Sequence, residues 1–227
     1  MVTIKDVAQG MPEKEEYYYR MAEQNKVDGI ICVTYQDVEP YVSENIPLIS
    51  LDRHFHKKVS CISSDNYHGG ELAAQKMIST GSRHLLYMRN GSEISGETLK
   101  RGKGFKSYCD AHGVSCETLN LGDDFDLIRG KTSVEEVLRN FIISARKTGK
   151  MRYDGIYTST DLLAKALLEQ MQFLGVEVPE EVQLVGHDGM QWMNSGKYLV
   201  STIVQPVPDM ARKAVELLLK KIKMGRD

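Results

Sequence analysis

The sequence lacks the features that mark membrane, exported and nucleic-acid-coating proteins. No apolar run approaches the roughly 20 residues that a transmembrane helix needs. The N-terminal segment MVTIKDVAQG carries charges where an export signal has an apolar core. Basic and acidic residues number 29 and 31, a formal net charge of −2, so the chain as a whole has no general attraction to nucleic acid or to membranes.

Cysteine and recognisable catalytic motifs are also scarce. The 4 cysteines form no CxxC pair, and those in strand-like runs are expected to behave as small hydrophobes, which suits a reducing compartment. A GxGxxG pattern, a phosphate-binding glycine loop, a nucleophile elbow and a metal-ligand cluster are all absent from the sequence. We therefore expect no catalytic residue, no metal and no cofactor.

What the sequence does contain is a regular alternation of strand-like and helix-like segments. Hydrophobic residues make up 41% and charged residues 26%, as in an ordinary globular protein. Strands are predicted at 2–8, 29–35, 47–52, 84–90, 115–121, 154–160, 182–188 and 200–205. Helices are predicted at 12–25, 69–80, 99–113, 131–149, 161–175 and 208–225. This alternation predicts an α/β fold with parallel sheets whose strands are covered on both faces.

Polar residues collect directly after the predicted strands. In parallel α/β sheets ligands bind outside the carboxyl ends of the strands, so these residues are the first candidates for a site. They include Tyr35, Asp52, Thr160, Asp188 and Gln205.

A series of longer segments covers nearly the whole chain in a fixed order. They are PEKEEYYYRMAEQNKVDGIICV, IPLISLDR, ISSDNYHGGELAAQKMISTGSRHLLYM, RGKGFKSYCDAHGV, DGIYTSTDLLAKALLEQMQFLGVEVPEEVQLVGHDG and STIVQPVPDMARKAVELLL. Together they resemble the effector-binding domain of LacI/GalR-type bacterial transcription regulators. The most specific part is GVEVPEEVQLVGHDG followed by TIVQPV.

The resemblance implies a periplasmic-binding-protein-like type I fold. This fold has two doubly wound parallel-sheet subdomains, joined by crossover strands, with an effector in the cleft between them. Here the N-terminal subdomain is expected at 1–62 plus 205–227 and the C-terminal subdomain at 63–204. The family's DNA-binding headpiece and its final strands have no counterpart, so we expect a chain that is incomplete at both ends.

The resemblance also assigns two principal ligand-binding residues. Arg101 matches the effector-clamping arginine of an R-x-x-G-F motif; the alternative is a solvated arginine at a lysine-rich helix start. Asp188 matches the first aspartate of a strand-end motif; the alternative is an Asx-type turn with Gly189. His187 and Gly189 depart from the family's usual residues, and we expect them to bear on ligand preference.

Five further ligand contacts carry alternatives that the sequence leaves open. Asp52 is either an N-terminal-subdomain contact or a surface charge beside Arg53, and Phe125 is either a stacking aromatic or a loop residue packed on its own domain. Thr160 stands where the family often has asparagine. Gln205 contacts ligand or satisfies hinge backbone, and Tyr35 is a candidate wall of the cleft.

These features predict a cytoplasmic ligand sensor that performs no chemistry. Its expected partners are a small sugar-like effector and a second copy of itself, with operator DNA reached only through a headpiece outside this chain and with no membrane. One alternative is an exported periplasmic-type sugar-binding protein, which shares the architecture. A second is an enzyme with a site between Asp52 and Asp188, against which the missing nucleophile–base and metal sets argue.

Overall fold

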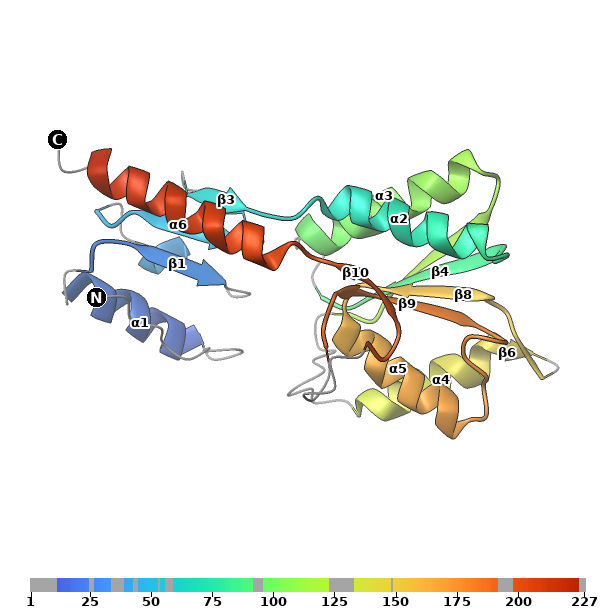
Figure 1. The fold of residues 1–227 in the computed structure, drawn as a ribbon. Helices are drawn as coiled ribbons and strands as arrows, with labels where there is room; N and C mark the ends of the chain where they lie inside the picture. The colour runs from blue at the N-terminus through green and yellow to red at the C-terminus, as the bar shows by residue number, and fades with distance from the viewer. Residues whose placement is uncertain are drawn as a thin grey trace. The chain divides into compact units, whose positions relative to one another are not determined.

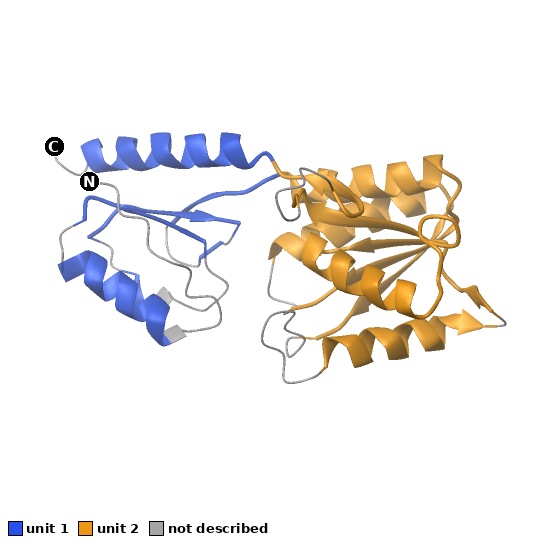
Figure 2. Cartoon of the chain, turned by 60° about the horizontal axis from the view of Figure 1, so that its bottom comes forward, with its two compact units in different colours: residues 1–64, 206–227 blue, residues 65–205 orange. Residues whose placement is uncertain are grey.

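The chain folds as two compact units. The computed structural model describes residues 12–24, 27–33, 39–42, 45–52, 54–55, 59–91, 96–122, 133–147, 149–191 and 198–224. Unit 1 is Met1–Ser64 with Pro206–Asp227, and unit 2 is Asp65–Gln205, coloured blue and orange in Figure 2. The expected subdomain boundaries, 62/63 and 204/205, lie within two residues of this division.

Unit 1 contains a small parallel sheet between two helices. Its strands β1 (Ile30–Val33), β2 (Leu48–Leu51) and β3 (Ser60–Ile62) pair in that order. Helix α1 (Pro12–Gln24) lies on one face, and α6 (Val207–Met224) packs on the other, as Figure 1 shows. A 3-10 turn, η1 (Glu39–Tyr41), precedes β2. Tyr19, Val42 and Leu48 form one buried apolar cluster of this unit, and Ile49, Met210 and Ala214 are also buried.

Unit 2 is a five-stranded parallel sheet covered by helices on both faces (Figure 1). In sheet order the strands are β10 (Ser201–Val204), β9 (Gln183–Asp188), β8 (Gly155–Thr158), β4 (His84–Arg89) and β5 (Ser115–Asn120). Helices α2 (Asn66–Ser79) and α3 (Gly96–Ala111) cover one face; α4 (Val134–Ala145) and α5 (Asp161–Phe173) cover the other. Alternate strand residues therefore feed two separate apolar cores.

The described elements match the expected alternation closely. The predicted α/β fold with two parallel-sheet subdomains is confirmed. The three-residue strand β3 and the short antiparallel pair β6 (Arg146–Lys147) and β7 (Lys150–Met151) were not predicted. The strand predicted at 2–8 lies outside the described residues. None of the described helices has the length and apolar character needed to cross a membrane.

Helices α2 and α3 approach each other at backbone distance. A methyl group on Gly70 would overlap the carbonyl oxygen of Arg101, and one on Gly104 would overlap that of Tyr67. Glycine at both positions therefore lets the two helices cross closely. This crossing brings the first residue of α2, Asn66, within hydrogen-bond distance of Arg101 in α3.

Candidate ligand-binding site

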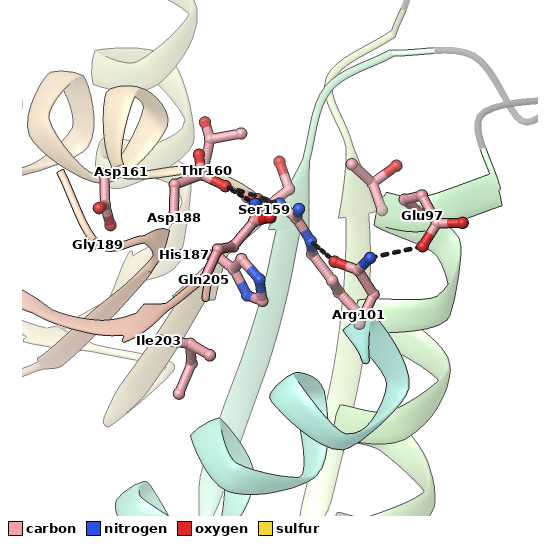
Figure 3. A network of polar contacts seen from close by, with 12 residues as sticks. Glu97, Arg101, Ser159, Thr160, Asp161, His187, Asp188, Gly189, Ile203 and Gln205 are labelled. Atoms are coloured by element: carbon pink, nitrogen blue, oxygen red, sulfur yellow. Dashed lines mark hydrogen bonds and ion pairs between the residues drawn. The ribbon is translucent and has the colours of Figure 1, made fainter. Parts of the chain in front are cut away.

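The carboxyl ends of four strands meet at one edge of the unit 2 sheet. Residues at this edge are Arg89 at the end of β4, Ser159 just after β8, Asp188 at the end of β9, and Gln205 just after β10. The register places Val204 opposite Asp188, so that Gln205 follows directly beside it. A buried arginine from α3, Arg101, reaches the same edge (Figure 3).

Arg101 is the centre of the polar network in Figure 3. Its Nε donates to Asn66 Oδ1 at 2.7 Å, and its Nη1 donates to the carbonyl oxygen of Ser159 at 2.5 Å. Nη1 also lies 3.4 Å from Asp188 Oδ1, which makes a charged hydrogen bond. Within the described part of the chain, Nη2 donates to no protein group.

Two further groups hold Asn66 in place. The Nδ2 of Asn66 donates to Glu97 Oε2 at 2.5 Å, and both residues are buried. The other carboxylate oxygen of Glu97 accepts from Lys100 Nζ at 2.7 Å. A chain of polar contacts therefore runs from solvent through Lys100, Glu97 and Asn66 to the guanidinium of Arg101.

Asp188 has a backbone conformation that non-glycine residues rarely adopt. Its φ is 115°, and the following Gly189 has φ 78°. Gln205 Nε2 donates to Asp188 Oδ1 at 2.7 Å, and the side chain of Asp188 is 28% exposed. Strain of this kind costs about 1–3 kcal/mol and is concentrated at binding and catalytic sites. The carboxylate is thus fixed between an arginine and a glutamine while part of it stays accessible.

At the N-terminus of α5, the polar side chains of Thr160 and Asp161 are bound by the protein itself. Thr160 is the N-cap of α5, because its Oγ1 accepts from the backbone nitrogen of Leu163 at 3.2 Å. Asp161 accepts from Thr202 Oγ1 at 2.7 Å and from the backbone nitrogen of Met190 at 2.6 Å. Burial raises the pKa of Asp161 above its ordinary value. Asp161 therefore ties the segment after β9 to β10.

A buried aromatic layer lies beneath the edge, on the α2 and α3 side. The Nδ1 of His187 lies 2.6 Å from the hydroxyl of Tyr157, and the Tyr87 hydroxyl donates to the carbonyl oxygen of Thr98 at 2.7 Å. Burial, with a smaller contribution from the charge of Arg101, lowers the pKa of His187 to about 3. His187 is therefore neutral near pH 7, shares a hydrogen bond with the Tyr157 hydroxyl, and is buried in the core rather than exposed at the edge.

The structure brings together three of the predicted ligand-binding residues, namely Arg101, Asp188 and Gln205. The hydroxyl of Thr160 already caps α5, and Asp52, with φ 55°, belongs to unit 1. Their ligand contacts remain predictions.

Two of the predicted contacts cannot be placed. Phe125 and Tyr35 lie outside the described residues. Among the described residues, no group of three His, Cys, Asp or Glu side chains is arranged to hold a metal ion.

Sequence reasoning missed the residues that hold Arg101. Asn66, Glu97 and Ser159 lie far from their partners along the chain. Asn66 and Ser159 stand within the segments that carry the family resemblance, but nothing in those segments pairs them with Arg101. The four-residue spacing between Glu97 and Arg101 places both on one face of a helix and is a local signal for Glu97.

Comparison with known protein families assigns the chain to one of them. The model of the periplasmic binding protein-like domain matches residues 74–227, more than half of the chain, and the chain belongs to this family.

Its relatives confirm the resemblance to LacI-type regulators. The chain is 29% identical over 216 residues to the sucrose operon repressor of Streptococcus mutans, covering 95% of this chain and 63% of the repressor. It is 30% identical over 212 residues to the ribose operon repressor of Bacillus subtilis, covering 93% of this chain and 61% of that protein. The chain thus spans less than two thirds of the length of these curated relatives.

Solved structures agree with this assignment. A periplasmic binding protein/LacI transcriptional regulator from Alkaliphilus metalliredigens, complexed with D-xylulofuranose, matches with a TM-score of 0.70 and 27% identity over 94% of this chain and 76% of that chain. The transcription regulator CcpA of Lactococcus lactis matches with a TM-score of 0.75 at 18% identity, over 96% of this chain and 79% of that chain, which shows the fold alone.

Proposed function

We propose that the chain is the effector-binding and dimerisation part of a bacterial LacI/GalR-type transcription regulator, and that it senses a sugar or sugar derivative at the carboxyl edge of the unit 2 sheet. The observation that carries the proposal is the buried Arg101 guanidinium beside the partly exposed Asp188 carboxylate, in a chain related to sugar-operon repressors. These names favour a regulator over an exported sugar-binding protein.

The chemistry of the edge suits a polyhydroxylated ligand. A sugar hydroxyl both donates and accepts, so one hydroxyl oxygen accepts from Arg101 Nη2 while a neighbouring hydroxyl donates to Asp188. The two protein groups are held before ligand arrives, Arg101 by Asn66 and Ser159, and Asp188 by Gln205. Such preorganisation lowers the entropic cost of ordering these side chains when the ligand binds.

The regulator's other properties are proposed from its relatives. The ribose and sucrose operon repressors are named for operons, which supports an operator-binding headpiece in the whole protein and a homodimer that matches two DNA half-sites. We propose a cytoplasmic protein that binds its effector without changing it. Turnover of a bound sugar by the purified protein would contradict the last point.

A thermal-shift screen tests the ligand assignment. The panel comprises ribose, xylulose, sucrose and cellobiose, with purines and sugar phosphates as chemically different arms. Arg101→Ala should lower the affinity for a stabilising compound about 10- to 100-fold, as expected for loss of a charged hydrogen bond at a buried site.

The matched control is Lys106→Ala, on the same helix but exposed and paired with Asp110. It should leave the affinity unchanged. A stabilising compound whose affinity is the same in wild type, Arg101→Ala and Asp188→Ala would contradict the proposed site.

A further inference from the structure

We propose that Asn66 is a positioning residue that sets the charge class of the ligand. It holds Arg101 so that only one guanidinium nitrogen, Nη2, remains to bind. The site then takes an uncharged polyhydroxy compound and discriminates against its carboxylate or phosphate derivatives. The inference rests on the proposed function, in which Arg101 contacts the effector.

Most N–H groups of the Arg101 guanidinium are already bound by the protein. A guanidinium has five N–H groups, one on Nε and two on each Nη. The Nε hydrogen is directed to Asn66 Oδ1, and the two Nη1 hydrogens are taken by the Ser159 carbonyl and by Asp188 Oδ1. The two hydrogens of Nη2 therefore remain.

The N–H groups that Arg101 has left do not form the parallel pair that an anion requires. Arginine binds a carboxylate or phosphate strongly when two parallel N–H groups from two different nitrogens face two oxygens. With Nε and Nη1 committed to the protein, Arg101 has no such pair. The two diverging hydrogens of Nη2 suit two separate hydroxyl oxygens instead.

Glu97 fixes the orientation of the Asn66 amide, with Oδ1 directed toward Arg101. The carboxylate of Glu97 only accepts, so the Nδ2 of Asn66 must face it, at 2.5 Å. This leaves Oδ1 directed to the Nε hydrogen of Arg101, at 2.7 Å. A flipped amide would place donor against donor at one end and acceptor against acceptor at the other. Because Asn66 and Glu97 are both buried, water does not relieve that conflict.

The local charge supports the same conclusion. Asp188 lies 3.4 Å from Arg101 Nη1 and already offsets much of its positive charge. A ligand anion placed at Nη2 would face this carboxylate as well as the guanidinium.

The positioning is tested first on the ligand-free protein. In a proton–nitrogen NMR spectrum of the 227-residue chain, the Nε–H signal of Arg101, identified by its loss in Arg101→Lys, should exchange slowly with water. Asn66→Ala should speed this exchange at least about tenfold, as expected for loss of a hydrogen bond to a charged group.

Glu97 variants provide the control and a second route. Glu97→Gln keeps an oxygen that accepts from Asn66 Nδ2 and should preserve slow exchange, whereas Glu97→Leu removes it and should speed exchange. If Asn66→Ala does not fold, the Glu97 pair decides the question. Equal exchange in wild type, Asn66→Ala and Glu97→Leu overturns the positioning role.

The ligand class is tested with matched neutral and anionic probes in titration calorimetry. D-ribose is compared with D-ribonate and D-ribose 5-phosphate, and sucrose with sucrose 6-phosphate. Wild type should bind a neutral probe at least about tenfold more tightly than its anionic counterpart. Asn66→Ala should reduce this affinity ratio, because the freed Nε–H and an Nη2–H of Arg101 can then bind two oxygens of an anion in parallel.

Each remaining outcome has a distinct meaning. The inference is overturned if wild type binds an anionic probe as tightly as its neutral counterpart. It is also overturned if the ratio of neutral to anionic affinity is the same in Asn66→Ala as in wild type. A wild type that binds none of the probes contradicts the proposed function for these sugars, and the positioning of Arg101 is then decided by Nε–H exchange alone.

Discussion

Asp188 combines a strained backbone with a fixed carboxylate. Its φ of 115° belongs to a region where glycine is favoured, yet the residue is an aspartate held by Arg101 and Gln205. In the sequence, the alternative to a ligand contact at Asp188 is an Asx-type turn with Gly189. The positive φ and the two side-chain partners favour the ligand-binding interpretation, because strain of this kind is retained mainly where it serves function.

Two substitutions at Asp188 separate strain from binding. Asp188→Ala and Asp188→Gly both remove the carboxylate, but only glycine relieves the backbone. After allowing for the greater entropy of glycine in the unfolded chain, Asp188→Gly should be more stable than Asp188→Ala by about 1 kcal/mol. Urea unfolding measures the difference. An alanine variant as stable as the glycine variant would show that the conformation is not strained.

His187 makes stability depend on pH. Its pKa is about 3 in the folded protein against an ordinary 6.5, so between these values the unfolded chain binds a proton that the folded chain does not. The free energy of unfolding should therefore fall as the pH drops below 6.5, by about 2 kcal/mol between roughly pH 7 and pH 5.

The variant His187→Gln isolates this contribution. It keeps a polar side chain for Tyr157 but does not titrate, so the pH dependence should become shallower by that amount. Asp161, whose pKa burial raises, is present in both proteins and cancels in the comparison. Parallel stability curves for wild type and His187→Gln would contradict the assignment.

At the scale of elements, the crossing of α2 and α3 builds the site. The crossing depends on glycines that face backbone carbonyls, Gly70 facing that of Arg101 and Gly104 that of Tyr67. Separating the helices would withdraw Asn66 from Arg101 and leave a buried guanidinium without that partner. If Arg101 binds the effector as proposed, we expect stability and ligand affinity to be linked at this crossing.

Gly70→Ala tests the crossing, and Gly96→Ala in the same helix pair is its control. A methyl group on Gly70 overlaps backbone, so we expect a loss of about 1–3 kcal/mol in stability together with weaker sugar binding. Nothing lies within 4 Å of a methyl group on Gly96. Chemical unfolding of both variants measures the difference in stability. If Gly70→Ala is as stable as Gly96→Ala, the helices adjust to the added methyl group without cost.

The sequence predicts elements better than it predicts the site. The longer strands covered on both faces were predicted because their apolar runs are longer than those of loops. Strand β3 was missed because it is three residues long and begins with the polar residue Ser60. The strand-end rule located Asp188 and Gln205. It could not locate Asn66, Glu97 and Ser159, because their contacts join positions 31, 35 and 58 residues apart.

At the scale of the whole molecule, the two units differ in how much core they bury. Among the described residues, unit 1 has a small cluster around Tyr19, Val42 and Leu48, whereas unit 2 has two larger cores, one on each face of its sheet. Local stability follows buried apolar contact. We therefore expect unit 1 to open more readily than unit 2.

Native-state hydrogen exchange measures this difference. Amides of β1 and β2 should exchange with a lower opening free energy than amides of β4, β8 and β9. Mass spectrometry of peptides from each sheet gives the comparison in one experiment. Equal protection in the two sheets would indicate that the chain unfolds as a single cooperative unit.

The most direct test of the central claim is titration calorimetry of the wild-type protein with the sugar that stabilises it most, repeated with Arg101→Ala, Asp188→Ala and Lys106→Ala. We expect saturable binding by wild type and Lys106→Ala, with affinity lowered about 10- to 100-fold in each of the other two variants while their folds remain intact. Equal affinity in all four proteins would contradict it.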